Sequence, residues 1–347
     1  MSDFSLSRRK FNLGVAAVAA SLPLMSSRAF AAGRVVAATF PNAWEDAYRR
    51  VIVPILQGQG TELVIAPALA QDQLAAMMAS PNNPPYDALL MSPGQSAVAI
   101  ENGLIQRIDP ARLANWGTLD PAFQSEWGPA VTVEVNGIAY NPDVVPPPTG
   151  YQDLFENAAY DNKVAWIGFG SNTATMAYTE IAKIYGTGAD DMEAVFDLFR
   201  SYLPKVGVIA NSGSHQMTLY QQGEISVFMA STNNVATLKA LGVPCEFVHP
   251  VTGSPAVPVN IHLTAGAANP DGVYEYMDAA ISAAAQAELT MPPTETFPSN
   301  GTVPLTESIA AYVTREMLPS FVYPDWAMIN AHRADWTREF DRIVAGG

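Results

Sequence analysis

The chain has 347 residues, a formal net charge of −15 at pH 7 and hydrophobic side chains at 49% of its positions. Nucleic-acid binding requires a basic surface, so this charge argues against DNA or RNA as a partner. Cys245 is the only cysteine, which rules out an intrachain disulfide. The length suffices for two domains of ordinary size, and the apolar content predicts a sizeable core.

The first 31 residues have the pattern of a cleavable export signal. Arg8 and Arg9 precede a mostly apolar run at 13–25, which is about half of the ~20 residues that a membrane-spanning helix needs. A small-residue cleavage pattern follows at 29–31. Adjacent arginines are typical of twin-arginine signals, and an ordinary basic signal is the alternative. We expect cleavage near Ala31 and a periplasmic mature protein.

The next stretch predicts three strands that alternate with three helices. Asn42 can cap the first helix, and Pro54 is expected to kink or shorten it. Strands that alternate with helices are typical of a parallel sheet covered on both faces. The predicted strands are 34–40, 62–66 and 86–91, and the predicted helices are 44–56, 71–79 and 93–102.

The pattern changes after residue 126. Residues 127–141 read as two extended pieces around Asn136-Gly137, and a second β/α series follows. Its strands are predicted at 163–167, 225–229, 244–248 and 257–263, with helices ending at Tyr185 and spanning 195–203 and 274–287. The tail at 309–344 is predicted to be largely helical. Two α/β lobes joined by extended segments predict a cleft between them.

Candidate ligand-binding residues follow from this arrangement, because open α/β sheets bind ligands beyond the carboxyl ends of their strands. Trp44 can stack on a ligand or anchor the core of its helix. Asn260 is a polar residue within an apolar run, and its side chain needs partners that a ligand or a hinge could supply. The candidates in loops or turns after strands are Trp44, Ser92, Ser171, Asn172, Thr173, Ser231, Thr232 and Asn233, and Asn260 completes the set.

Four stretches resemble the periplasmic solute-binding proteins of ABC importers, in the group that contains the spermidine/putrescine-binding proteins. The first is the strand, loop and Trp-led helix at 40–56. The others read YDALLMSPGQSAVAIENGLIQRID from Tyr86, NGIAYNPDVV from Asn136 and YQQGEISVFMAS from Tyr220. The group places a ligand-binding hydroxyl at the position of Ser92, whose alternative role is to cap the next helix.

This resemblance implies a two-lobed α/β fold of type II, with a ligand cleft between lobes joined by an extended hinge. Lobe 1 is expected at 33–137 plus 262–303, and lobe 2 at 138–261 plus 304–347. The implied partners are a small-molecule ligand and an ABC permease in the inner membrane, and we expect a monomer. A ligand-binding component of a sensor system is an alternative.

The ligand expected from the sequence is a neutral or zwitterionic solute. The polyamine-binding group has acidic residues where this chain has Thr173, Met176 and Asn260, and a buried ammonium needs a carboxylate. The nearest acidic candidates are Glu45, Asp46 and Glu134. We therefore expect polyamines to bind weakly, unless one of these three turns into the cleft.

The sequence offers little support for an enzyme. It lacks the G-x-S-x-G elbow of hydrolases, and its four histidines show no spacing typical of metal ligands. Ser214 and His215 are adjacent, but neighbours in sequence rarely form a working dyad. An exported hydrolase is thus the weakest alternative, and no metal or cofactor is expected.

Overall fold

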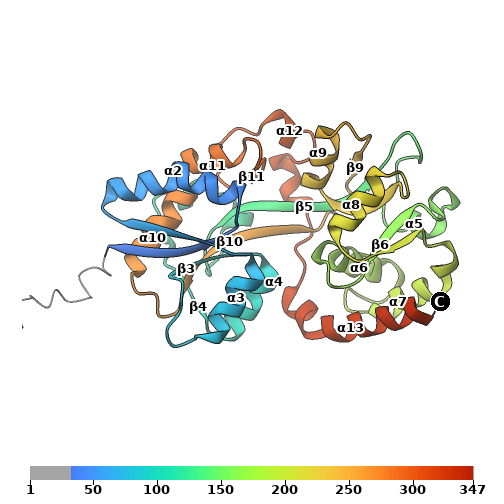
Figure 1. The fold of residues 1–347 in the computed structure, drawn as a ribbon, viewed down its shortest axis with the longest axis horizontal. Helices are drawn as coiled ribbons and strands as arrows, with labels where there is room; N and C mark the ends of the chain where they lie inside the picture. Colours follow the sequence, from blue (N-terminus) through green and yellow to red (C-terminus); the bar gives the residue numbers. More distant parts are fainter. Residues whose placement is uncertain (1–32, 347) are drawn as a thin grey trace, which may run out of the picture.

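The computed structural model describes residues 33–346 (Figure 1), so the predicted export signal lies outside the described residues. These residues have a mixed α/β architecture, as predicted. The strands are β1 (Arg34–Thr39), β2 (Glu62–Pro67), β3 (Ala88–Met91), β4 (Ile105–Gln106), β5 (Ala130–Tyr140), β6 (Val164–Ile167), β7 (Val208–Ala210), β8 (Val227–Ser231), β9 (Glu246–Val248), β10 (Ala256–Thr264) and β11 (Phe297–Pro298). The main strand order is β2-β1-β3-β10-β5-β8-β6-β7.

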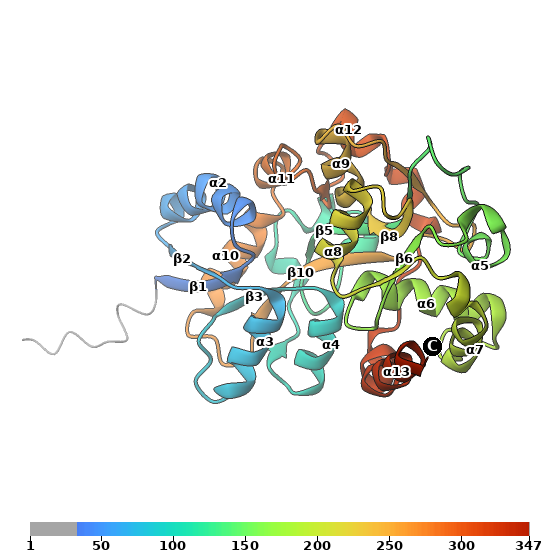
Figure 2. The same ribbon diagram turned by 45° about the vertical axis from the view of Figure 1, so that its right-hand side comes forward.

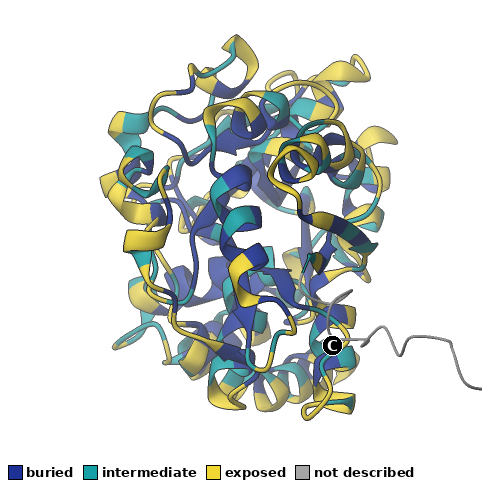
Figure 3. Cartoon of the chain, turned by 90° about the vertical axis from the view of Figure 1, so that its left-hand side faces the viewer, coloured by how far each residue is buried: buried dark blue, intermediate teal, exposed yellow. Residues whose placement is uncertain are grey.

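Helices cover both faces of this sheet (Figures 1 and 2). They are α2 (Ala43–Gln59), α3 (Ala70–Ala79), α4 (Pro93–Glu101), α5 (Asp153–Glu156), α6 (Asn172–Tyr185), α7 (Met192–Tyr202), α8 (Gly213–Gln221), α9 (Thr232–Ala240), α10 (Pro270–Ala280), α11 (Ala283–Leu289), α12 (Glu307–Ala310) and α13 (Trp326–Gly346). Their outward faces are exposed, whereas the strands are largely buried (Figure 3).

The first lobe is built on α2 and the parallel strands β1, β2 and β3. The apolar face of α2 buries Tyr48, Ile52 and Leu56 against α10 and α11. Pro54, predicted to kink or shorten this helix, does not shorten it, because α2 continues to Gln59. Pro54 lies on the exposed face, so the buried face and its packing remain intact, and packing supplies most helix stability.

A single long strand, β5, links the two lobes. Residues 130–140 form one strand, so the prediction of two pieces around Asn136-Gly137 was wrong. The first half of β5 pairs with β10 and β11, and the second half pairs with β8 and β9. Gly137 lies at this change of partners, where a Cβ atom would approach the Val248 oxygen to 2.5 Å. The glycine therefore permits a crossover instead of a turn.

The second lobe surrounds the parallel strands β6, β7 and β8. Its core is aromatic, and Trp166, Tyr178, Phe199 and Phe340 are all fully buried there. α13 contributes Phe340 and also contacts α4 of the first lobe. The lobe boundaries predicted at 137/138 and 261/262 fall inside β5 and β10 and remain a prediction.

Two further helix predictions need correction. The helix predicted at 274–287 is two helices, because α10 ends near Ile281 and the Ser282 hydroxyl caps α11. The tail, predicted to be helical apart from breaks at Pro319 and Pro324, has an additional break at 311–314, between α12 and the short helix at 315–320. The sequence patterns also missed β7, α8 and α9, which are all short.

The pairing directions place the carboxyl ends of the parallel strands toward each other. β10 is antiparallel to both β3 and β5, so β3 and β5 run in the same direction. β8 is antiparallel to β5 and runs back toward the first lobe. The ends of β1 and β3 therefore face the ends of β6 and β8, which is where α/β sheets bind ligands.

Candidate functional site

A cavity of about 320 Å³ lies where the starts of α2 and α9 meet the middle of β5. Figures 1 and 2 both place α2, α9, α11 and α12 on one side of β5 and β10, and α3, α4 and α13 on the other. A further wall comes from residues 294–297 and 308–313. The cavity is lined by Phe40, Pro41, Ala43, Trp44, Thr132, Val133, Glu134, Thr232, Asn233, Ala236, Val259, Thr294, Glu295, Thr296, Phe297, Ser308, Ile309, Tyr312 and Val313.

The entry into α2 brings Trp44 to this cavity. Asn42 occupies the position before the helix but makes no side-chain cap, contrary to the prediction, and its φ is 65°. Positive φ is strained for a residue other than glycine, and such strain clusters at binding sites. Trp44 is 9% exposed and packs edge-on against Phe40, with ring centroids 5.7 Å apart. It therefore anchors the core and lines the cavity at once.

The start of α9 supplies the polar wall. Ser231 ends β8, and its hydroxyl accepts a hydrogen bond from the Asn234 backbone N–H. The Asn234 side chain in turn accepts from the Ser231 backbone N–H at 3.0 Å. This capping box fixes the first turn of the helix. It leaves Thr232 and Asn233 at the cavity.

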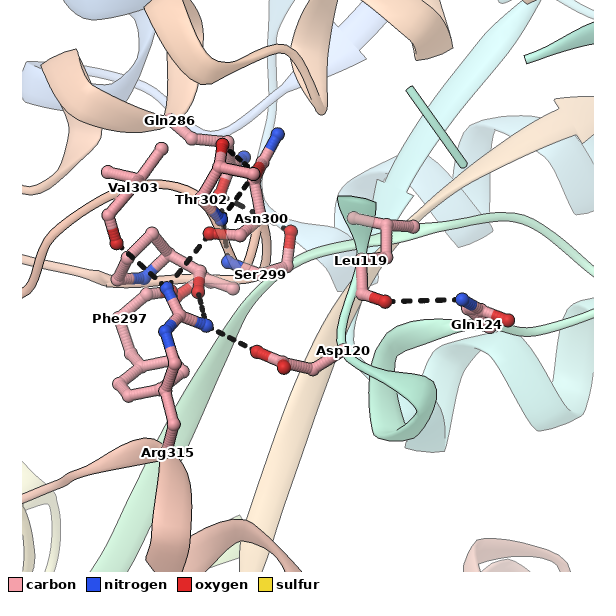
Figure 4. A network of polar contacts seen from close by, with 12 residues as sticks. Leu119, Asp120, Gln124, Gln286, Phe297, Ser299, Asn300, Thr302, Val303 and Arg315 are labelled. Atoms are coloured by element: carbon pink, nitrogen blue, oxygen red, sulfur yellow. Dashed lines mark hydrogen bonds and ion pairs between the residues drawn. The ribbon is translucent and has the colours of Figure 1, made fainter. Parts of the chain in front are cut away.

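This further wall is held by a polar network around Arg315 (Figure 4). The guanidinium pairs with Asp120 and donates to the backbone oxygens of Asn300 and Val303 at 2.8 and 2.9 Å. It also lies over the Phe297 ring, 5.3 Å from the centroid. Because Phe297 lines the cavity, Arg315 positions part of the cavity wall without lining it.

The floor of the cavity is a carboxylate on β5. Side chains alternate along a strand, so Thr132, Glu134 and Asn136 share one face. Val133 and Val135 join a buried cluster with Phe297, and Val133 and Phe297 also line the cavity. The Glu134 side chain lines the cavity and is exposed to solvent. It was named as a possible acidic candidate but was not among the predicted site residues.

Desolvation raises the pKa of the Glu134 carboxyl above its usual range, and the nearby Ser231 hydroxyl opposes this shift. Within residues 33–346, Glu134 has no ion-pair partner. The described side chains that line the cavity include no lysine, arginine or histidine. The cavity therefore carries an uncompensated negative charge.

The family model for bacterial extracellular solute-binding proteins matches residues 58–316. The chain belongs to this family. The spermidine/putrescine-binding periplasmic protein of Salmonella typhimurium is 21% identical over 233 residues, which cover 63% of this chain and 65% of that protein. The match thus spans slightly less than two thirds of the curated relative.

Solved structures share the fold. An ABC transporter structure from Clostridium perfringens has a TM-score of 0.79 at 22% identity, covering 89% of this chain and 99% of that chain. A GABA receptor has a TM-score of 0.71 at 19% identity, covering 90% and 97%. These likenesses confirm the predicted two-lobed fold of solute-binding proteins and do not identify a ligand.

The nine site residues predicted for this solute-binding protein do not all lie at the same cavity. Trp44, Thr232 and Asn233 line the cavity, and Ser231 lies beside it. The Thr173 hydroxyl donates to the Asn136 side chain at 3.1 Å, next to Glu134 along β5. These five residues therefore gather around the middle of β5.

The remaining four residues have other surroundings. The Asn172 side chain accepts from Arg333 at 2.7 Å, and Asn260 donates to the Gly128 backbone oxygen at 2.9 Å. Ser171 caps α6 and lines a separate cavity beside α13. Ser92 precedes α4 and makes no side-chain cap. Asn260 thus finds its expected partner in the backbone near the crossover.

Two Ser–His side-chain pairs among the described residues lie within hydrogen-bond distance, Ser254 with His249 and Ser96 with His262, and His262 is the more deeply buried of the two histidines. The Ser96 hydroxyl lies 2.7 Å from His262 Nε2, and His262 Nδ1 lies 2.7 Å from the Trp127 backbone oxygen. Burial lowers the pKa of His262 to about 4, so its ring is neutral. Ser96 is buried within α4, and a carbonyl, not a carboxylate, orients the histidine. The pair satisfies buried polar groups, as is usual in a core.

Among residues 33–346, no cluster of three or more His, Cys, Asp or Glu side chains could hold a metal ion. None of the described helices combines the length and the apolar character that crossing a membrane requires.

Proposed function

We propose that this protein is the extracytoplasmic solute-binding component of an ABC importer, and that it binds a small polar organic solute in the cavity at Glu134. The main support for this proposal is the position of the cavity between the two lobes. Its walls include the start of α2 in one lobe and the start of α9 in the other, with β5 between them. A solute that contacts both walls favours the closed arrangement of the lobes, and such closure is how two-lobed binding proteins enclose ligands.

The relatives support this proposal by what their names state. The Salmonella relative is named for spermidine and putrescine, and solved neighbours are named for GABA and for glucopine. These solutes are small and nitrogen-containing. For this protein the proposed site residues are Trp44, Glu134, Ser231, Thr232 and Asn233.

A thermal-shift screen tests this function. The panel consists of amines, amino acids, sugars and organic acids. A ligand at about 100 times its dissociation constant adds ~2.7 kcal/mol to the free energy of unfolding, which raises the melting temperature by several degrees. Melting temperatures that do not move with any class would contradict a binding role.

A matched pair of variants locates the binding site. Thr232→Val removes a cavity hydroxyl, and Thr218→Val removes an exposed hydroxyl on α8. The first change should reduce the ligand-induced shift, because a lost hydrogen bond in a closed site costs about 1 kcal/mol. The second should leave the shift unchanged. Equal shifts in both variants would place the site elsewhere.

We also propose that the protein reaches the periplasm through the twin-arginine route. The support is the Arg8-Arg9 pair before an apolar run. Replacing both arginines with lysine keeps the positive charge and should leave the protein in the cytoplasm. Fractionation of cells that express either form measures this directly. Normal export of the lysine variant would assign the general route instead.

A further inference from the structure

The described residues that line the cavity at Glu134 carry negative charge and no positive charge. Glu134 and Glu295 are the charged side chains among its described lining residues. The basic groups nearest to its walls are engaged elsewhere. Lys239 pairs with Glu246 at 2.8 Å and lies 5.5 Å from the Tyr312 ring centroid, and Arg315 pairs with Asp120.

The two carboxylates differ in their surroundings. Glu295 accepts a hydrogen bond from the Ser308 hydroxyl at 3.0 Å. Glu134 is held at the cavity floor, where desolvation raises the pKa of its carboxyl. A desolvated carboxylate without a cation costs free energy until a positive group approaches it. Neither glutamate has an ion-pair partner among the described residues, and Glu134 is the one that lies on β5, between the starts of α2 and α9.

The other cavity walls suit a positive charge as well. Phe40, Trp44, Phe297 and Tyr312 line the cavity from three separate segments. Aromatic faces attract cations, and ammonium groups are commonly bound between such rings. A carboxylate below aromatic walls is therefore a site for an organic cation.

We propose that the solute bears one cationic amine group and that Glu134 binds it. This inference rests on the proposed function and narrows its substrate class to compact monocationic or zwitterionic amines. A second ammonium would have Glu295 as its acidic partner, whose carboxylate already accepts a hydrogen bond from the Ser308 hydroxyl, and burying an incompletely compensated charge is costly. Glu134 thus determines specificity for charge from a position on the crossover strand β5.

A series of four-carbon probes tests the charge directly, because chain length stays constant. The probes are butylamine, 4-aminobutyrate, putrescine, butyrate and 1-butanol, measured by calorimetric titration. Butylamine and 4-aminobutyrate should bind more tightly than the other three. The inference would be overturned if butyrate, 1-butanol or putrescine bound more tightly than butylamine.

Variants assign the effect to one side chain. Glu134→Gln keeps the size and removes the charge, and it should weaken butylamine binding about 10- to 100-fold. Glu224→Gln makes the same change in an exposed turn after α8 and should leave binding unchanged. Melting curves of the empty variants establish that both are folded. Equal butylamine affinity in folded Glu134→Gln and wild type would overturn the inference.

The outcomes separate the two proposals. Saturable binding of a neutral solute that the Thr232→Val change weakens and Glu134→Gln does not would overturn the amine inference and leave the binding function standing. Failure of all five probes and of the wider panel would overturn both.

Discussion

The surroundings of Arg315 and of Glu134 both include Phe297 but differ in charge pairing. Among the described residues Arg315 has a partner of opposite charge, and Glu134 has none. Arg315 has a carboxylate partner in Asp120, two close carbonyl oxygens and the Phe297 ring (Figure 4). Glu134 lines the cavity and has no cation within the described residues. Phe297 belongs to both regions, since it lies against Arg315 and also lines the cavity.

This difference distinguishes structural charge from charge kept for a ligand. A charge whose partners are all supplied by the protein stabilises one arrangement, here the segment that leads out of the first lobe. A charge left unpaired in a cavity destabilises the empty protein slightly and increases its affinity for a ligand that neutralises the charge.

Replacing Phe297 should have the largest effect, because both regions use this ring. Phe297→Ala removes a side chain that is 4% exposed and should lower the free energy of unfolding by about 3–5 kcal/mol. Phe297→Leu fills part of the space and should cost less. Urea denaturation measures both changes. A loss below 1 kcal/mol for the alanine variant would show that the wall does not depend on this ring.

Replacing Arg315 should have the next largest effect and should act on stability. Arg315→Met leaves Asp120 and two backbone oxygens without their donor, and we expect a loss of about 3 kcal/mol. Arg315→Lys should recover only part of it, since lysine lacks the planar fork of donors. Denaturation curves of the three proteins give the comparison. If lysine restored full stability, charge alone, without the geometry of the network, would explain the role of Arg315.

Replacing Glu134 should have the smallest effect on the empty protein, and in the opposite direction. The folded-state pKa of this carboxyl is raised, so ionisation costs stability as the pH rises from the unfolded value of about 4.5 through the raised value. Glu134→Gln should therefore be equally stable in acid and slightly more stable at neutral pH, by less than about 1 kcal/mol because solvent reaches the side chain. Melting temperatures across this pH range measure the difference, and a destabilised variant at neutral pH would contradict an unpaired charge.

Much of the fold was predictable because its signals are local. The alternation of apolar strands and amphipathic helices at 34–102 gave six elements close to their observed bounds. Pro54 and Asn136-Gly137 misled the prediction, because burial of one helix face and pairing with two different partners decide those positions. Neither the face that a proline occupies nor the partner of a strand is encoded in a short stretch of residues.

The site was predictable in part for the same reason. Trp44, Thr232 and Asn233 follow strands, and the rule that ligands bind beyond strand ends led to them directly. Glu134 lies within a strand and gave no such signal, although the alternation of Val133, Glu134 and Val135 marks a polar residue on one face. That this face borders a cavity depends on segments at 294–297 and 308–313, which are far away in the sequence.

Proton release on ligand binding tests the central claim most directly. If Glu134 stays unpaired until an amine binds, butylamine binding must expel a proton from the fraction of protein whose Glu134 is protonated. Calorimetric titrations in buffers of different ionisation enthalpy, at about pH 5.5 and about pH 8, count these protons. We predict release at the lower pH that falls toward zero at the higher pH, with weaker affinity in acid, and no release from Glu134→Gln at either pH. Equal proton release from wild type and Glu134→Gln would contradict the account.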